Sequence, residues 1–358
     1  MRPPEPPPRL ASVDALRGIT VAAMLLVNTP GDWGHVYAPL RHAQWHGCTP
    51  ADLVFPVFLF VVGVSLALSL VPRREARADG AHLSRAVLWR AVRIVAIGLL
   101  LHGLAWWALD LPAFRPWGVL QRIGLCVALA GLAALTLGPR QQWLLCAGLL
   151  LGSAAVLAGG GMAPGTNPFD RFDTALFAPA LYRYDAATGL GHDPEGLAST
   201  AGALATTLLG LRAGTWLRAG RVRTLAIAGL VALGLGGMWS WWLPLNKPLW
   251  SPSYVLWTGG IAMLALAAVH VLIDRRGWPP LGRRFGVNAI AIYTGSIACV
   301  LLSIAGGEWA PLYRHAFETP LLPWIGPHGA SLAFALAFVL VWWCIAWALD
   351  RRGLYLKV

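Results

Sequence analysis

The sequence predicts an all-α protein, a polytopic bundle of about ten transmembrane helices. The chain of 358 residues is 57% hydrophobic and only 12% charged, whereas soluble domains carry about 25% charged residues. Stretches of about 20 mostly apolar residues, the length that crosses a bilayer, recur along the chain. Its 19 tryptophans fit aromatic belts at the two membrane interfaces.

The expected spans begin after a proline-rich arm, residues 1–10, which we expect to be disordered. No small-residue cleavage site follows the first apolar run, so we interpret this run as a retained helix and not as a signal peptide. Residues 11–358 then form a single transmembrane domain. Its spans are expected at residues 12–30, 51–71, 86–107, 118–137, 142–158, 197–212, 222–242, 254–274, 286–305 and 329–350.

Arginine and lysine indicate how these spans are oriented. The N-terminal arm, the C-terminal tail and four alternate loops hold 18 of the 28 basic residues, the opposite loops hold six, and four lie within spans. Basic loops stay on the cytoplasmic side, so both termini are expected there, in a multi-pass protein of the cytoplasmic membrane. The net charge of +12 is then a topology signal that implies contact with membrane lipid and not with nucleic acid.

The opposite loops are the long ones, at about 31–50, 159–196 and 306–328. Long polar loops over a helix bundle are a frequent place for a binding site. The five cysteines are scattered without metal or disulfide spacing, so no metal site is expected. Only Cys48 lies beside a polar motif, which makes it a candidate for a chemical role. We find no internal repeat that indicates a two-fold transporter architecture.

Charged and amide side chains within the first span suggest function, because such groups are costly in a bilayer. Asp14 and Arg17 are three residues apart, share a helix face and can pair, either as an interfacial anchor or as part of a site. Asn28 follows at the other end of the same helix, ~21 Å further along its axis.

The third and fourth spans also contain polar residues. Arg90 and Arg93 lie near the cytoplasmic end, either as snorkelling anchors or as ligands of an anion with several phosphates, which guanidinium groups bind well. Gln121 and Arg122 lie one turn inside the fourth span. An arginine at that depth is hard to explain as an anchor, so we expect it to face a cavity.

The stretch RHAQWHGCTPADL, residues 41–53, joins two histidines to the start of an apolar helix. Thr49 and Asp52 have the spacing of a helix N-cap and an acidic N3 residue, which explains Asp52 without any chemistry. It does not explain His42 or His46, which are either solvated loop residues or, beside Trp45 and a carboxylate, a general base.

Two later motifs allow both a structural and a functional interpretation. In HDPEGL, Asp193 can cap a helix with Glu195 in its first turn. The stretch PLNKPLWSPSY, residues 244–254, is either a rigid turn with Trp250 in the interface belt or part of a binding site. It holds Lys247, the one lysine in the outer loops.

Seven stretches, in order and with similar spacing, resemble one family, the heparan-α-glucosaminide N-acetyltransferases and their bacterial relatives. They are RLASVDALRGIT, HAQWHGCTPADLVFPVFLFVVG, GVLQRIG, DPEGLASTAGALATTLLGLRAG, LNKPLWSPSYV, FGVNAIAIY and LDRRGLYLKV. The resemblance covers almost the whole chain from about residue 9. The large N-terminal region of the animal enzymes, with its additional helix, has no counterpart in this sequence.

The resemblance implies an enzyme of the bacterial inner membrane that takes acetyl-CoA from the cytosolic side and acetylates the amine of a glucosamine on the other side. The family's catalytic histidine falls on His42, because HAQW matches its H-A-x-W motif. His46 stands where the family usually has Asn, and Cys48 where it has Leu. The family's polar residue at the end of the first span maps to Asn28, although the following glycines are replaced by Thr-Pro-Gly-Asp.

The resemblance and the polar residues together suggest a role for each candidate. Catalytic roles fall to His42, Asn28 and Asp52; acetyl-CoA binding to Arg17, Arg90, Arg93, Arg122, Gln121 and Asn288; and binding of the amino-sugar acceptor to Trp45, His46, Asp193, Glu195, Asn246, Lys247 and Trp250. A homodimer is one option for the assembly.

We expect neutral His42, oriented by Asp52, to take a proton from the sugar amine, with Asn28 donating to the developing oxyanion. Alternatively, His42 carries the acetyl group transiently. Two other functions stay open: O-acetylation of a periplasmic or cell-wall glycan, and transport of amino sugars.

Overall fold

The computed structural model describes residues 10–356, so all but the last residue of the proline-rich arm lies outside the described part of the chain. The long helices are α1 (Ala11–Asn28), α2 (Pro50–Glu75), α3 (Gly80–Ala108), α4 (Val119–Thr136), α5 (Pro139–Gly160), α7 (Thr200–Arg218), α8 (Val222–Trp239), α9 (Pro252–His270), α11 (Ala289–Ala305) and α13 (Thr319–Arg351). Each of the ten expected spans therefore corresponds to one helix.

Shorter elements connect these helices. They are the helical turn η1 (Ala38–Leu40), α6 (Pro168–Phe177), the antiparallel strands β1 (Arg183–Asp185) and β2 (Leu190–His192), the π-helical turn η2 (Val271–Arg275), α10 (Arg283–Val287), α12 (Trp309–Tyr313) and the π-helical turn η3 (Arg314–Glu318). The helix α13 is interrupted at Gly326, whose φ of 68° lies in the left-handed region that glycine adopts without strain.

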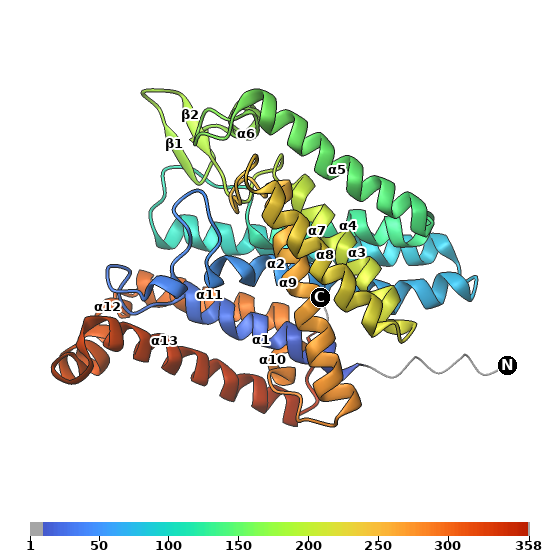
Figure 1. Ribbon diagram of the computed structural model, residues 1–358. Coiled ribbons are helices and arrows are strands. Elements are labelled where there is room, and N and C mark those ends of the chain that lie inside the picture. The colour runs from blue at the N-terminus through green and yellow to red at the C-terminus, as the bar shows by residue number, and fades with distance from the viewer. Residues whose placement is uncertain (1–9, 357–358) are drawn as a thin grey trace.

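The long helices form one bundle, with α6, β1 and β2 gathered at one end (Figure 1). The loop between α1 and α2, which carries His42, lies at this end too, and we call it the histidine end. The α2–α3 loop lies at the opposite end. We call that end the arginine end, because Arg17, Arg90 and Arg93 lie toward it.

Eight helical segments of residues 10–356 are long and apolar enough to cross a membrane: α1, α2, α3, α4, α5, α8, α9 with η2, and α12 to α13. Two of the ten expected spans, α7 and α11, do not reach this threshold, so the structure supports eight spans of the ten. The reason differs between them. Helix α11 has only 17 residues, whereas α7 has 19 residues but contains several threonines and glycines.

Helix α7 is less apolar because it lies inside the bundle, where it faces other helices instead of lipid. Most of its residues are buried against α2, α4, α5 and α9. The contact with α2 is made backbone to backbone: a Cβ added at Gly63 would lie 2.0 Å from the Thr207 carbonyl oxygen, and one at Gly210 would lie 2.0 Å from that of Phe60. Small residues permit such close packing of membrane helices.

Candidate active site

The histidine that the sequence singled out is held by the aspartate ten positions later. The Nδ1 atom of His42 lies 2.8 Å from Oδ1 of Asp52. Asp52 is the third residue of α2 and is fully buried, whereas 41% of the His42 side chain is exposed. The pair thus combines a carboxylate inside the bundle with an imidazole that is accessible at the histidine end.

Asp52 has a structural and a site role at the same time. Its Oδ2 accepts hydrogen bonds from the backbone N–H of Thr49 and from the Thr49 hydroxyl, both at 3.0 Å, so the predicted cap of α2 is confirmed. The same oxygen accepts the backbone N–H of Ala43 at 3.0 Å, and Oδ1 is left for His42. Because every neighbour is a donor, the carboxylate is stabilised in its ionised form.

An ionised Asp52 fixes the tautomer of His42. A carboxylate accepts but cannot donate, so the Nδ1 of His42 carries the proton and its Nε2 carries the lone pair. The lone pair is on the nitrogen that does not face Asp52. An imidazole in this arrangement can take a proton from a bound molecule, and the charge that it gains is stabilised by the buried carboxylate.

A lysine from the loop between α8 and α9 completes this cluster. The Nζ atom of Lys247 lies 3.1 Å from Nδ1 and 3.4 Å from Nε2 of His42, and 3.5 Å from Oδ1 of Asp52. Burial lowers the pKa of the Lys247 ammonium, against the opposing effect of the carboxylates of Asp52 and Glu195. An amine that gives up its proton more easily than usual therefore lies beside the candidate base.

Trp45 and Asn246 tie the histidine loop to the loop of Lys247. The buried Asn246 amide donates to the Trp45 carbonyl at 3.0 Å, and its Nδ2 lies 3.4 Å from Nδ1 of His46. The Asn246 oxygen accepts the backbone N–H of Leu249 at 2.8 Å. Since both ends of this amide are used within the protein, Asn246 positions the two loops, and its predicted contact with a sugar stays a prediction.

A second histidine–aspartate pair lies on the other side of Trp45, and the sequence interpretation missed it. Nδ1 of His192 lies 2.6 Å from Oδ1 of the buried Asp170. The rings of His192 and Trp45 meet edge to face with centroids 5.1 Å apart, and the Trp45 indole donates to the Met162 carbonyl at 2.8 Å. These residues are far apart in the sequence, so no spacing rule could have joined them.

The expected cap at Asp193 is wrong. Helix α7 begins only at Thr200, after Ser199, and Asp193 instead forms a two-point ion pair with Arg115 at 2.7 and 2.5 Å. Glu195 lies 2.6 Å from the same guanidinium. Burial by itself lowers the pKa of Arg115, but the two carboxylates outweigh it and hold that pKa above its usual range. Both acids therefore support the loop, and their predicted contacts with a sugar stay predictions.

Arg122 is fully buried, but it is not among the residues that line the apolar pocket described below, so its predicted place facing a cavity stays a prediction. Its guanidinium donates to the Gly196 carbonyl at 2.9 Å and to the Ser199 hydroxyl at 2.5 Å. It also lies over the Trp250 ring, 5.0 Å from the centroid. Trp250 is only 1% exposed, so it does not lie in an interface belt, and its predicted contact with a sugar stays a prediction.

Gln121, the neighbour of Arg122, is 2% exposed and faces Gly98. Neither polar atom of its side chain has a hydrogen-bond partner within the described residues. A buried amide without partners is costly. Gln121 thus has unused polar atoms between α3 and α4, although it does not line the apolar pocket described below.

At the arginine end, the predicted ion pair of Asp14 and Arg17 is confirmed, with Nη1 and Oδ1 2.9 Å apart. Arg17 also donates to the Ser65 hydroxyl at 2.7 Å and to the Gly286 carbonyl at 3.0 Å. Arg90 on α3 is within electrostatic range of both Arg17 and Arg93. Like charges at this range repel one another.

Two of the three candidate asparagines, Asn28 and Asn288, lie apart from these clusters. Asn288 is buried at the start of α11, where its side chain donates to the Leu354 carbonyl and accepts the Leu356 N–H, at 3.0 and 2.9 Å. It thereby holds the C-terminal tail. Asn28 is the last residue of α1 and is exposed at the histidine end. Among the described residues, its side chain has no hydrogen bond to the His42 cluster.

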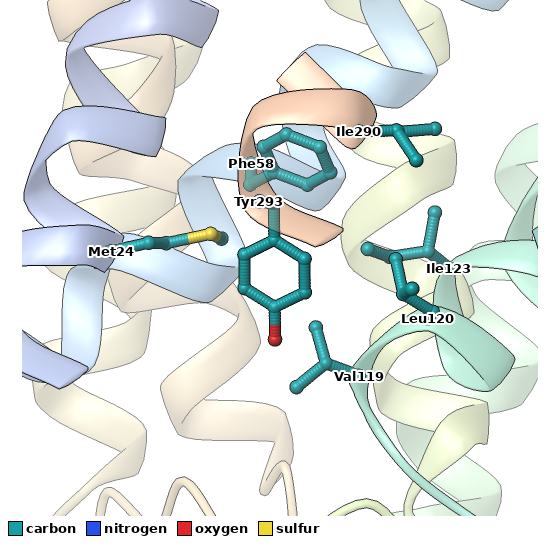
Figure 2. Close-up of a pocket in the computed structure, with 7 residues that line it drawn as sticks. All are labelled: Met24, Phe58, Val119, Leu120, Ile123, Ile290 and Tyr293. Atoms are coloured by element: carbon teal, nitrogen blue, oxygen red, sulfur yellow. The ribbon is translucent and has the colours of Figure 1, made fainter. Parts of the chain in front are cut away.

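An apolar pocket lies inside the bundle (Figure 2). Phe58, one of the side chains that line it, follows Asp52 by six positions on α2, or ~9 Å along the helix axis. In Figure 2, the Tyr293 ring stands between Met24 on one side and Leu120 and Ile123 on the other. The pocket thus lies between α1, α2, α4 and α11, in the interior that separates the two ends.

Cys48 is next to the cluster but is not a suitable nucleophile. Burial, together with the charge of Asp52, raises the pKa of its thiol to about 12. The thiolate, which is the reactive form of cysteine, is therefore scarce at neutral pH. The chemical role considered for Cys48 is not supported.

The fold and the site together define a class: a multi-pass helical membrane protein with a histidine–aspartate–lysine cluster open at one end of its bundle. Residues 9–180 match the family described as heparan-alpha-glucosaminide N-acetyltransferase, catalytic. This segment contains His42 and Asp52 but ends before the loop of Lys247.

The chain is also similar to two named proteins, the heparan-alpha-glucosaminide N-acetyltransferases of Homo sapiens and Mus musculus. It is 29% identical to the human protein over 81% of this chain and 27% identical to the mouse protein over 98% of it. The aligned regions span 53% and 60% of the lengths of those two proteins. The resemblance to this family, first noted in the motifs, is thereby confirmed.

Proposed function

We propose that this protein is an acetyl-CoA-dependent N-acetyltransferase that moves an acetyl group to the amine of a glucosamine-type sugar. One observation carries the proposal: in a chain similar to enzymes of this name, buried Asp52 holds the Nδ1 of an exposed His42 and leaves Nε2 for chemistry. Acetylation of an amine needs such a base, because a sugar amine is mostly protonated at neutral pH and attacks only after losing a proton.

In this proposal His42 Nε2 takes the proton from the sugar amine, and the amine then attacks the acetyl carbonyl carbon. Negative charge develops on the carbonyl oxygen, and nearby donors stabilise it. The Lys247 ammonium is the donor nearest to His42. Asn28, at the same end of the bundle, is the second candidate, and it would have to turn toward the cluster.

We propose that the acetyl donor binds from the arginine end, on the cytoplasmic side. Coenzyme A carries phosphates, and the guanidinium groups of Arg17, Arg90 and Arg93 are of the type that binds phosphate well. The long arm of the donor is flexible and partly apolar, and the small apolar pocket between the two ends would have to widen to admit it. In this arrangement both termini face the cytoplasm, and the histidine end faces the periplasm.

Fewer side chains are accessible for binding the amino sugar than the sequence suggested. Trp45, His46 and Lys247 have partly exposed side chains around His42, and aromatic faces with hydrogen-bond donors are typical of sugar sites. Asn246, Asp193 and Glu195 act through the loops that they hold. His192 joins the candidates because it lies against Trp45.

The experiment is acetyl transfer by the purified protein in lipid nanodiscs, with labelled acetyl-CoA and a panel of glucosamine, other amino sugars and glycans with only hydroxyl acceptors. Labelled N-acetylglucosamine is the expected product. Labelling of hydroxyl glycans alone would favour O-acetylation, and sugar uptake by proteoliposomes without consumption of acetyl-CoA would favour transport. Rapid quench without acceptor then separates direct transfer, which gives no burst of coenzyme A, from an acetyl-histidine, which does.

A further inference from the structure

Lysine is rare in this chain, and one of its lysines, Lys247, lies in the candidate active site. Only two of its 28 basic residues are lysines, Lys247 and Lys357, and the other 26 are arginines. A guanidinium stays protonated in proteins, whereas an ammonium can lose its proton when it is buried. The candidate site thus contains the type of basic side chain that can become a neutral nucleophile.

The surroundings of Lys247 resemble those that the proposed reaction requires for a sugar amine. Its Nζ lies beside the His42 ring, 3.1 Å from Nδ1 and 3.4 Å from Nε2, the nitrogen that carries the lone pair. The side chain is 18% exposed. Asp52 and Glu195 are the carboxylates in electrostatic range. An amine, a base and the carboxylate that orients the base are therefore already together without any sugar.

We propose that Lys247 is itself an acetyl acceptor, which the protein modifies when acetyl-CoA is present and no amino sugar occupies the site. This inference rests on the proposed function, because the same base and the same acetyl thioester are used. The product is Nε-acetyl-lysine at position 247, a modification of the protein's own chain.

Acetylation of Lys247 removes two protons from its ammonium group. His42 Nε2 takes one proton from the Lys247 ammonium, and the neutral Nζ attacks the carbonyl carbon of the acetyl thioester. A C–N bond forms and the C–S bond breaks, so that the sulfur leaves with the electron pair as a thiolate. The second proton of the amine passes to that thiolate, and the proton held by His42 returns to water. Nothing is oxidised or reduced.

The modification changes the site, because an amide is neutral and does not titrate at ordinary pH. Acetylated Lys247 no longer places a positive charge 3.5 Å from Asp52, and its added acetyl group takes up space beside His42. An amide is also stable to water, so the modified protein accumulates. We therefore expect acetyl-CoA without acceptor to slow later turnover, and glucosamine added first to protect the protein.

The test incubates the full-length protein in nanodiscs with acetyl-CoA bearing a deuterated acetyl group, without sugar, and maps acetylation by peptide mass spectrometry. We expect the label on Lys247 to exceed that on Lys357, the internal comparison, by at least ~10-fold, and to fall when glucosamine is present. Equal labelling of the two lysines would show uncatalysed acetylation and would overturn the inference.

Two variants sharpen the result. His42→Ala should slow labelling of Lys247 by ~100-fold or more, the usual contribution of a general base, and should leave Lys357 unchanged. Lys247→Arg should lose the label at that position, while size-exclusion chromatography shows that it is folded. If glucosamine is acetylated but Lys247 stays unlabelled, the inference fails and the proposed function stands; if no amine on sugar or protein is acetylated, both fail.

Discussion

The Nδ1 of His42 and the Oδ1 of Asp52 are 2.8 Å apart, and the aspartate that accepts this contact also caps the helix that follows. A single carboxylate therefore fixes both the start of α2 and the direction of the imidazole. Any movement of the first turn of α2 moves the base with it. The Asp52 side chain thus has two roles, as the cap of α2 and as the partner of the base, and variants of Asp52 and Thr49 can separate them.

His42→Ala should lower acetyl transfer to glucosamine by at least ~100-fold, because the general base is lost. Turnover of labelled acetyl-CoA and binding of coenzyme A are measured side by side, and binding should persist. The matched control is His35→Ala, which removes another histidine paired with an aspartate, Asp32, at 2.6 Å. Normal turnover by the His42→Ala protein would remove that residue from the reaction.

Asp52→Asn should lower both activity and thermal stability. The amide cannot favour the Nδ1–H tautomer of His42 as a carboxylate does, and it weakens the cap of α2 by ~1 kcal/mol or more. Thr49→Ala is the comparison, since it weakens the cap but leaves the contact of Asp52 with His42. We expect a lower melting temperature in both variants and a large loss of turnover only in Asp52→Asn. Similar activities for the two would show that Asp52 acts through the helix alone.

Arg115→Ala should destabilise the protein by ~3–5 kcal/mol, the usual cost of leaving a buried ion-pair partner alone. The partners left behind are Asp193, which is 2% exposed, and Glu195. Replacing Asp193 by Asn in the Arg115→Ala background should restore part of the loss, because it removes one of the stranded charges. A double-mutant cycle of chemical unfolding in detergent measures this coupling, and strictly additive effects would count against the pair.

Arg90→Ala and Arg93→Ala should each weaken coenzyme A binding by ~10-fold, the effect of losing one hydrogen bond to a charged phosphate. The control is Arg85→Ala, which removes an exposed arginine from the first turns of the same helix. Isothermal titration in nanodiscs gives the affinities at fixed ionic strength. Unchanged binding in both variants would leave these arginines as membrane anchors.

The fold around Asp173, a buried residue of α6, should lose stability as the pH rises from about 4 to about 6. Burial raises the pKa of this carboxyl from its usual 3.8 to about 6, so the folded protein holds a proton that the unfolded chain has already released. Stability from this group is complete below the unfolded pKa and is lost as the pH passes the folded one. In Asp173→Asn, the melting temperature should depend less on pH over this interval; an unaltered pH dependence would contradict the assignment.

Local spacing rules predicted much of the fold and part of the site. The apolar runs located the ten long helices, because each needs its own apolar surface. The pairs Asp14–Arg17 and Thr49–Asp52 lie within one helical turn, so the sequence alone could place them together. The number of spans was less predictable, since a helix enclosed by others, such as α7, no longer needs lipid-facing side chains.

Contacts between distant parts of the chain could not be predicted in this way. Lys247 and His42 are 205 positions apart, and Arg115 and Asp193 are 78 apart. Nothing in the HDPEGL motif shows that an arginine from another loop competes for its aspartate, so the expected cap at Asp193 was wrong. Trp250 was misplaced for a similar reason: only the packed structure shows that Arg122 and Thr206 enclose its ring.

The glycine contact between α2 and α7 restricts how the bundle can change shape. At Gly63 and Gly210 the two backbones lie so close that one helix cannot slide or rotate past the other without collision. Helix α2, which begins beside His42, is therefore restrained on the side that packs against α7. We therefore expect an opening that admits a donor molecule to the pocket to come from the other helices that line it, α1, α4 or α11.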